Sequence, residues 1–509
     1  MSMMRGFFTV GFWTLISRVL GFFRDIFIAG VLGASPVAEA FVVAFSLPNL
    51  FRRFFAEGAF NMAFVPMFSK KLASGDAPLV FAKDALSMLG LVLIALNVIA
   101  LMAMPYLVWL MASGFSGDER FDLTVIFGRI AFPYILFISL AALISGVLNS
   151  AGKFIAAAAA PILLNLCFIA ALFVASWMGW NIGLALAWSV PLAGIAQLSF
   201  VWVAAYRAGF SLVPRMPRMT PELRRLALIA APVALAGGVV QINLLVGRQI
   251  ASYFEGANAW LYYADRLYQL PLGVVGIAVG IVLLPDLSRR LRVGDASGGR
   301  QAFNRAAEFS LLLTIPAAVA LLVIPTTLVS VLFERGAFTS ADTSATALAT
   351  AIYGLGLPAF VLQKLYQPLF FAREDTKSPF YFALVALAVN AVVALCLRPY
   401  FGFLSAAYGA TFAGWAMLVC LWWGSRKFGE AAHLEPTLRA KVGRIFLASF
   451  MMGAVVWGIT ALMSPVLQMS GYRVPALLII LVVGLGSYVL AGRITGAFTV
   501  GELRRKLRD

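Results

Sequence analysis

The sequence predicts an all-α polytopic membrane protein, and three observations support this. Hydrophobic residues make up 62% of the 509 residues and charged residues only 12%, which leaves too little polar surface to cover a soluble globule. Apolar runs of roughly 20 or more residues recur along the whole chain, and each is long enough to cross a bilayer as a helix. The polar–apolar alternation of a membrane-spanning strand is missing, so we expect a helical bundle rather than a β-barrel.

Polar breaks divide the apolar runs into fourteen predicted transmembrane helices. The first follows the sequence MSMMRGFF, which imitates a signal peptide. Arg18 and Arg24 inside the apolar run, and the lack of a small-residue cleavage site, favour a retained first helix. The fourteen helices are expected near residues 7–32, 36–67, 84–113, 121–149, 154–179, 182–206, 223–254, 257–288, 303–334, 340–371, 380–399, 402–425, 440–463 and 472–494.

Positive charge is distributed unevenly between the two sets of loops that these helices create. Of the 39 Lys and Arg residues, 27 fall in the tails and loops on the side of the N-terminus. Only four fall on the opposite side, namely Arg120, Arg335, Arg398 and Arg473. The positive-inside rule therefore predicts that both termini are cytoplasmic. The same bias accounts for the net charge of +17 without a nucleic-acid partner.

Three sequence matches indicate an internal repeat. Each joins helix n to helix n+6, and they are the motifs at 66–72 and 285–291, the prolines Pro133 and Pro358, and the asparagines Asn165 and Asn390. An even offset gives both copies the same orientation, so we expect two six-helix lobes in parallel pseudo-symmetry around a central cavity. The predicted domains are an N-terminal lobe at 1–218, a C-terminal lobe at 219–435, and a helix pair with a basic tail at 436–509.

Eight basic residues fall inside predicted helices. At about 2.5–3.5 kcal/mol each at a helix centre, exposing all of them to lipid would cost roughly 20–28 kcal/mol, so they must face protein or water. Four acidic residues are available as partners, which leaves four positive charges in surplus. Arg53 and Glu57 have i, i+4 spacing, and Arg18 and Asp25 share a helix face. The eight are Arg18, Arg24, Arg52, Arg53, Arg129, Arg248, Arg266 and Lys364, and the acids are Asp25, Glu39, Glu57 and Asp265.

Four of these arginines predict an anion site. Given a rise of about 1.5 Å per residue, Arg18 and Arg52 fall near the bilayer midplane, and Arg24 and Arg266 lie about 5–10 Å toward the outer side. Guanidinium groups bind phosphate oxygens bidentately and stay charged at any working pH, so a diphosphate is the ligand that fits best. Structural ion pairing between helices is the alternative, and it is favoured for the other four basic residues taken singly.

The sequence carries no residues for an enzymatic reaction. It contains no P-loop lysine motif, no metal-ligand cluster and no nucleophile with a histidine base, so we expect a transporter rather than an enzyme. A membrane glycosyltransferase or polymerase would need acidic or histidine residues in a long outer loop, and the predicted outer loops are short. The LFERGAF motif (Leu332–Phe338) predicts a compact turn at the outer end of a helix. The chemistry of its side chains does not by itself indicate a function.

Four motifs in fixed order carry a resemblance to a known family. They are SRVLGFFRD (Ser17–Asp25), LPNLFRRFFAEGAF (Leu47–Phe60), YYADRLYQLPLGVVGIAVG (Tyr262–Gly280) and LFERGAF. The chain resembles the bacterial lipid II flippases called MurJ or MviN, of the multidrug/oligosaccharidyl-lipid/polysaccharide exporter superfamily. The resemblance implies two six-helix lobes and a C-terminal helix pair that forms a lipid-facing groove. The implied activity is translocation of lipid II, the undecaprenyl-diphosphate disaccharide-pentapeptide, from the inner to the outer leaflet of the cytoplasmic membrane.

The resemblance also implies site residues and partners. Substrate contacts are expected from Arg18, Arg24, Arg52, Arg266 and Glu39. The charges inside the predicted helices, rather than the resemblance, predict supporting ion pairs among Asp25, Arg53, Glu57 and Asp265. The implied partners are lipid II, membrane lipid and the cell-wall synthesis machinery.

Ion coupling and substrate class stay open within this resemblance. Some family members bind sodium through carboxylates in helices 7 and 11, but residues 223–254 and 380–399 contain no Asp or Glu, so neither a sodium site nor another cofactor is expected. Gln269 stands one turn after Arg266, where some relatives carry an acid, and coupling to the membrane potential is expected instead. Alternative functions are export of another polyprenyl-diphosphate oligosaccharide and cation-coupled drug antiport.

Overall fold

The computed structural model confirms the predicted helical class. It describes residues 3–52, 59–278, 289–290, 295–373, 375–432, 434–469 and 471–498, and every regular element within them is a helix. Ten candidate spans among the described residues are long and apolar enough to cross a membrane, and they correspond to ten of the fourteen predicted segments. One of them, Glu119–Ser150, includes two consecutive helices. The other four predicted segments, 7–32, 36–67, 223–254 and 257–288, each include positions whose backbone or side chains are outside the description.

The chain forms two compact units, residues 1–259 and 260–509. The boundary between the units lies later than the predicted lobe boundary at 218/219. The reason is that α10 (Pro221–Ala251), the seventh predicted helix, packs on α3 (Ala59–Ser74) of the first unit. The repeat-based boundary at 218/219 stays a prediction about symmetry.

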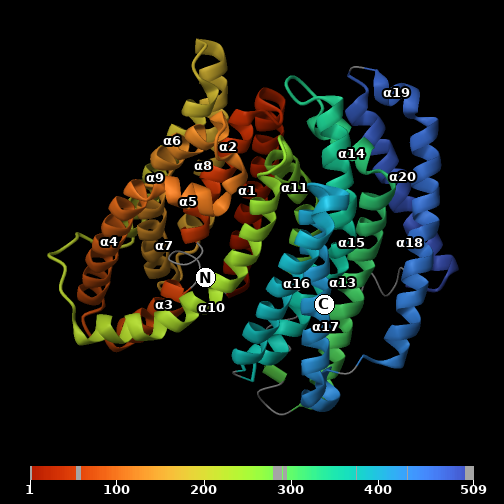
Figure 1. Cartoon of the computed structure of the whole chain (residues 1–509). Helices are drawn as coiled ribbons and strands as arrows, with labels where there is room; N and C mark the ends of the chain where they lie inside the picture. The colour runs from red at the N-terminus through yellow and green to blue at the C-terminus, as the bar shows by residue number, and fades with distance from the viewer. Residues whose placement is uncertain are drawn as a thin grey trace. The chain divides into compact units, whose positions relative to one another are not determined.

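The first unit is a bundle in which helices distant in sequence lie side by side (Figure 1). α8 packs on α1 and α9, while α2 packs on α6. Besides α3 and α10, the described elements of this unit are α1 (Met3–Leu32), α2 (Pro36–Arg52), α4 (Pro78–Met102), α5 (Met104–Met111), η2 (Ser113–Phe115), α6 (Glu119–Ala131), α7 (Tyr134–Ser150), α8 (Ile155–Met178), α9 (Ile182–Arg207) and the start of α11 (Ala257–Ala278).

Prolines divide three of the predicted helices. The segment predicted at 84–113 is split into α4 and α5 just before Pro105, and the segment predicted at 121–149 is split into α6 and α7 at Pro133. Pro325 likewise begins α14 (Pro325–Phe333) directly after α13 (Ala296–Val323). Proline lacks the backbone N–H and its ring crowds the carbonyl of residue i−4, so the helix ends and restarts at these points.

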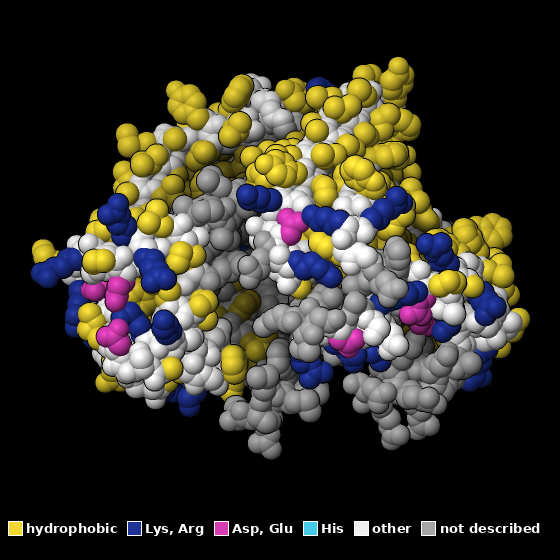
Figure 2. All heavy atoms as spheres, turned by 90° about the horizontal axis from the view of Figure 1, so that it is seen from below, with side chains coloured by type: hydrophobic (Ala, Val, Ile, Leu, Met, Phe, Trp, Pro, Cys, Tyr) yellow, Lys and Arg dark blue, Asp and Glu magenta, His cyan; other side chains and the backbone are white. Residues whose placement is uncertain are grey.

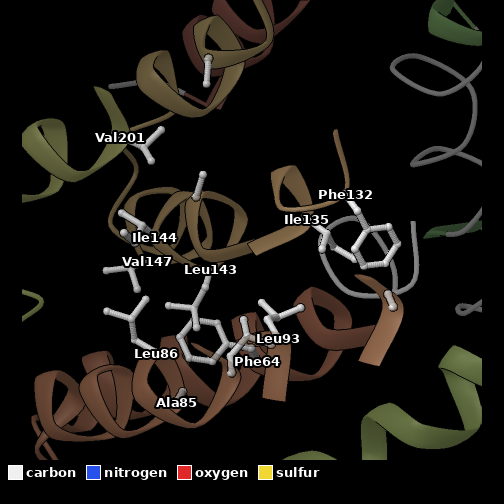
Figure 3. Packing of buried hydrophobic residues seen from close by; sticks show 14 of the residues in the cluster. Phe64, Ala85, Leu86, Leu93, Phe132, Ile135, Leu143, Ile144, Val147 and Val201 are labelled. Carbon is white, nitrogen blue, oxygen red and sulfur yellow. The ribbon is translucent and has the colours of Figure 1, made fainter. Parts of the chain in front are cut away.

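Apolar packing between α3, α4 and α7 forms the core of the first unit (Figure 3). The Phe64 ring stacks against Phe68 and Phe81, with ring centroids 5.6 and 5.5 Å apart. Leu143 and Ile144 of α7 face this cluster and are fully buried. In a membrane, such contacts rely on close packing because lipid tails are as apolar as the side chains they replace.

The second unit packs α13, α15 and α17 together and carries a helix pair on α13. The pair consists of α18 (Pro436–Leu462) and α20 (Arg473–Ile494), which pack on each other. Tyr488 of α20 donates a hydrogen bond to the Leu312 carbonyl of α13 at 2.8 Å and so ties the pair to the unit. The other elements are α15 (Ser340–Phe371), α16 (Lys377–Phe401), α17 (Leu404–Ser425), η4 (Arg426–Ala432) and α19 (Ser464–Gln468).

Some basic side chains lie at helix ends. Figure 2 shows Lys and Arg side chains on the face seen from below, with hydrophobic side chains toward the top of the view. Among the described residues at helix ends, Lys71 lies in the last turns of α3 and Arg207 in the last turn of α9. The concentration of Lys and Arg in one set of loops stays a prediction.

The connection between α15 and α16 is fastened to η4 by a charged contact. Lys427 Nζ donates to Asp375 Oδ2 at 2.6 Å, and the Ser378 backbone N–H and hydroxyl donate to the same carboxylate at 3.0 and 2.7 Å. The hydrogen bond from Lys427 lowers the pKa of Asp375 to about 2 from its ordinary 3.8, with a further lowering from the Ser378 N–H.

This contact predicts a pH dependence of stability. Because the folded-state pKa of Asp375 is below its ordinary value, the contact stabilises the fold above about pH 4, and this stabilisation is lost as the pH falls toward about 2. We therefore expect Asp375→Asn to lower the melting temperature of the purified protein at about pH 6 and to have a smaller effect at about pH 3. Asp84→Asn is the control, since Asp84 has no hydrogen bond or ion pair in the described chain. An effect of Asp375→Asn that does not vary with pH would contradict this assignment.

Candidate functional site

Arg24 of α1 lies in a buried polar cluster in the first unit. Its Nε and Nη2 donate to Asp25 Oδ1 at 2.9 and 2.7 Å, and its Nη1 donates to Asn165 Oδ1 of α8 at 3.0 Å. The guanidinium also lies 5.2 Å from the centre of the Phe168 ring. Arg24 is only 7% exposed and Asp25 only 1%. A buried charge needs a partner of this kind, because desolvation without one costs several kcal/mol.

Asn165 is a site residue that the sequence marked only as part of the repeat. Its amide nitrogen donates to the Ser17 carbonyl at 2.9 Å while its oxygen accepts from Arg24, so one side chain joins α8 to two turns of α1. The sequence feature that could have marked Asn165 as a site residue is its polar amide inside an apolar span. Sequence alone could not show which helix that amide would contact.

Arg18 and Arg52 differ from Arg24 in exposure. Arg18 is exposed on α1 and has no hydrogen bond or ion pair of its side chain within the described chain. The expected contact with Asp25 is therefore not formed, because Asp25 accepts from Arg24 instead. Arg52 ends α2, is half-buried, and donates from Nε to Asn49 Oδ1 at 3.3 Å. The predicted pair of Arg53 and Glu57 lies outside the described residues.

Arg266 belongs to the second unit, on α11. Its guanidinium lies 4.4 Å from the centre of the Tyr262 ring, one turn earlier on the same helix. The neighbouring Asp265 accepts a hydrogen bond from Gln269. Stacking on an aromatic face holds the plane of the guanidinium in one orientation.

Glu39 of α2 is fully buried and bonded to protein groups on both oxygens. Oε1 accepts from the Asn258 N–H at 3.0 Å, and Oε2 accepts from the Gly256 N–H at 2.9 Å and from Arg120 Nη1 at 3.0 Å. These bonds fix the turn between α10 and α11 onto α2. In this conformation a substrate could reach Glu39 only after they open, so the expected substrate contact stays a prediction.

Arg120 is a second residue whose place the sequence did not give. The sequence analysis placed it in a loop on the outer side, and in the structure it lies in the first turn of α6 and is only 8% exposed. Besides Glu39, its Nη2 donates to Asp118 Oδ2 at 2.6 Å, and its guanidinium lies 4.4 Å from the Phe115 ring. The sequence shows that Arg120 is a charged residue in a short connection between helices. Its burial against α2 depends on how that connection folds.

The η2 segment docks next to the same turn. The Ser113 N–H donates to Gln249 Oε1 and the Gly114 N–H to Ser252 Oγ, each at 3.0 Å. A Cβ on Gly114 would lie 2.5–2.7 Å from the backbone of Ser252 and Tyr253, a distance at which one backbone must move. Only glycine therefore allows η2 to approach the end of α10 so closely. Glu39 and η2 together secure the α10–α11 turn.

Fold and site together define a multi-pass helical membrane protein with arginines inside helices of both units. The family model for lipid II flippase MurJ matches residues 28–475. The chain belongs to this family.

Individual relatives agree with the family assignment. A probable lipid II flippase MurJ of Rhizobium tropici is 44% identical over 100% of this chain and 97% of its own length. A probable lipid II flippase MurJ of Rhizobium meliloti (strain 1021) is 46% identical over 90% of this chain and 86% of its own. A lipid II flippase MurJ of Burkholderia cenocepacia is 34% identical over 90% of each chain.

Solved structures show the same fold. A lipid II flippase MurJ in an inward closed conformation matches with a TM-score of 0.80 and 25% identity, over 95% of this chain and 98% of that one. A multidrug resistance MATE transporter in an inward-facing conformation matches with a TM-score of 0.70 and 14% identity, over 82% and 95%. At 14% identity the second match shows a shared architecture alone.

The Glu39 contacts predict a large stability effect. Glu39→Ala would leave the buried Arg120 without one of its partners and two backbone N–H groups without acceptors. We expect a loss of about 3–5 kcal/mol in the free energy of unfolding, as for other broken buried pairs. The measurement is thermal or denaturant unfolding of the purified protein. Glu222→Ala is the control, since Glu222 pairs with Lys71 near the surface, and equal losses from both variants would contradict the burial argument.

Proposed function

We propose that this chain is a flippase that moves lipid II from the inner to the outer leaflet of the bacterial cytoplasmic membrane by alternating access. Membership of the MurJ family carries the proposal, together with arginines in helices where lipid would not tolerate them. The partners are lipid II, membrane lipids, and the cell-wall synthesis machinery that supplies and consumes this lipid. Translocation needs no covalent chemistry, so the proposal includes no enzymatic step.

The proposed architecture has fourteen transmembrane helices in two six-helix lobes around a central cavity, with α18 and α20 as an added pair. Ten candidate spans and the repeat offsets support it. Both termini are cytoplasmic in this proposal, which the uneven division of Lys and Arg between the two sets of predicted loops supports. An alternating-access cycle then moves the head group past a cavity that opens to one side at a time.

Arg18, Arg24, Arg52 and Arg266 hold the diphosphate in this proposal. Arg18 supports it most directly, because its charge has no partner in the described chain and exposing it to lipid at a helix centre would cost about 2.5–3.5 kcal/mol. Arg24 is fixed by Asp25 and Asn165, which orient its guanidinium before a ligand arrives. Pre-orientation lowers the entropy lost on binding.

The polyprenyl tail stays in lipid along α18 and α20. A pocket of about 250 Å³ between α13, α15 and the start of α18 supports this, since its lining includes Leu311, Leu362, Leu438 and Val442. Arg439 also lines the pocket. Apolar walls suit a hydrocarbon chain, and an arginine suits the membrane–water boundary, where long basic side chains place their charge.

The runner-up function, cation-coupled drug antiport, is not favoured. A cationic drug would need an intramembrane carboxylate to attract it, whereas the three predicted intramembrane acids that the structure describes are each hydrogen-bonded to a protein side chain. Asp25 bonds Arg24, Glu39 bonds Arg120, and Asp265 bonds Gln269. The likeness to a multidrug transporter reaches only to the fold.

Removing a phosphate contact should abolish transport without unfolding the protein. A charge-assisted hydrogen bond contributes about 1.5–3 kcal/mol, so Arg18→Ala and Arg52→Ala should each weaken lipid II binding about tenfold or more. Native mass spectrometry with lipid II measures binding, and reconstituted vesicles measure transport. Arg207→Ala, at the exposed end of α9, is the control. Full complementation of a flippase-depleted strain by both variants would refute the proposed site.

The surplus positive charge also predicts coupling to the membrane potential. A potential that is negative inside pulls a cationic cavity toward the cytoplasmic side, at about 2.3 kcal/mol per charge and 100 mV. We expect lipid II transport in reconstituted vesicles to slow when an ionophore collapses the potential. A rate that stays the same would remove this part of the proposal and leave the head-group site untouched.

A further inference from the structure

The LFERGAF motif lies at a junction of the second unit. Residues 332–338 begin in the last turn of α14 and lead toward α15, and we call the stretch from Leu332 to Thr339 the α14–α15 connection. Its side chains contact α11, the first turn of α15 and the first residue of α20. α11 is the helix that carries Arg266.

Three buried aromatic rings join this connection to α11. Phe333 and Phe338 lie with ring centroids 5.4 and 5.5 Å from that of Tyr263, and 6.1 Å from each other. All three rings are at most 2% exposed. Gly336 makes this closure possible, because its φ of +58° reverses the chain between the two phenylalanines at little steric cost.

Polar contacts hold the same connection from both ends. Trp260, at the start of α11, donates from Nε1 to Asp342 Oδ1 at 2.8 Å, and the other oxygen of Asp342 accepts from Thr339 in a capping box. Glu334 Oε2 accepts from Thr343 Oγ1 at 2.9 Å, while Arg473 of α20 donates to the Glu334 carbonyl at 3.3 Å. The connection is therefore a fixed support for α11.

The rotation of α11 about its axis decides where Arg266 points. Tyr262 and Arg266 are one turn apart on one face and stack on each other. Tyr263 is the next residue after Tyr262, about 100° further around the helix. Holding Tyr263 in the aromatic cluster thus fixes the direction of the Tyr262–Arg266 face.

We propose that Phe333 and Phe338 are positioning residues for Arg266, acting through Tyr263 to set the rotation of α11. The inference rests on the proposed function, in which Arg266 contacts the diphosphate of lipid II. It gives the LFERGAF motif a role at the substrate site without requiring that the motif touch the substrate. A buried aromatic cluster that served packing alone would stabilise the unit but would not affect binding through Arg266.

A double-mutant cycle separates the two roles. Lipid II affinity is measured by native mass spectrometry of the full chain for wild type, Phe338→Leu, Arg266→Ala and the double variant, with melting temperatures recorded alongside. Residues that act through one another give non-additive effects. We expect Phe338→Leu to weaken binding about 3–10-fold in the wild-type background and less than about twofold in the Arg266→Ala background.

Two further variants complete the experiment. Phe370→Leu is the control, since Phe370 is equally buried in an aromatic cluster with Phe382 and Phe428 and should leave lipid II affinity unchanged. Trp260→Phe removes the hydrogen bond to Asp342 but keeps a ring against Phe403, so it tests the same support if Phe338→Leu does not fold. It should show the same non-additivity with Arg266→Ala.

The outcomes distinguish this inference from the proposed function. Equal losses from Phe338→Leu in both backgrounds, or a loss of affinity from Phe370→Leu as large as that from Phe338→Leu, would overturn the positioning role while the flippase assignment stands. An unchanged affinity for Arg266→Ala alone would instead remove Arg266 from the proposed substrate site.

Discussion

The structure depends on one constraint, that a charge taken out of water inside a helical bundle must find a partner. Glu39 meets it with one guanidinium and two backbone N–H groups, and Arg24 meets it with a neighbouring carboxylate and an amide from another helix. Each solution ties segments that are far apart in sequence. The charged contacts therefore determine which loops and turns are fixed, while apolar packing fills the space between them.

Satisfied and exposed charges have different consequences for function. Arg24 and Glu39 are held by protein groups, so their geometry is set before any ligand binds. Arg18 is exposed on the same helix as Arg24 and has no partner in the described chain, and the proposed function assigns its charge to an anionic head group. Arg266 is intermediate, since Tyr262 supports its flat face.

Several predictions made from the sequence differ from the structure. Three predicted helices are divided at prolines, because an apolar run records length and hydropathy but not the missing N–H that ends a helix. Arg120, expected in a loop on the outer side, lies in the first turn of α6 and is buried, and Asp25 pairs with Arg24 rather than Arg18. In each case, contacts from other segments outweighed the local pattern.

The sequence by itself determined the helical membrane class, the excess of arginines over available acids, and the family. The membrane class and the charge excess follow from the composition of successive segments, and the family follows from the order of the sequence motifs. None of these properties depends on a contact between distant residues. Only the tertiary structure decided which charges are satisfied, that Asn165 orients Arg24, and that the LFERGAF motif supports the helix of Arg266. Such partnerships depend on distances of a few ångströms between side chains that chain order does not bring together, and hydrogen bonding and stacking fall off steeply beyond those distances.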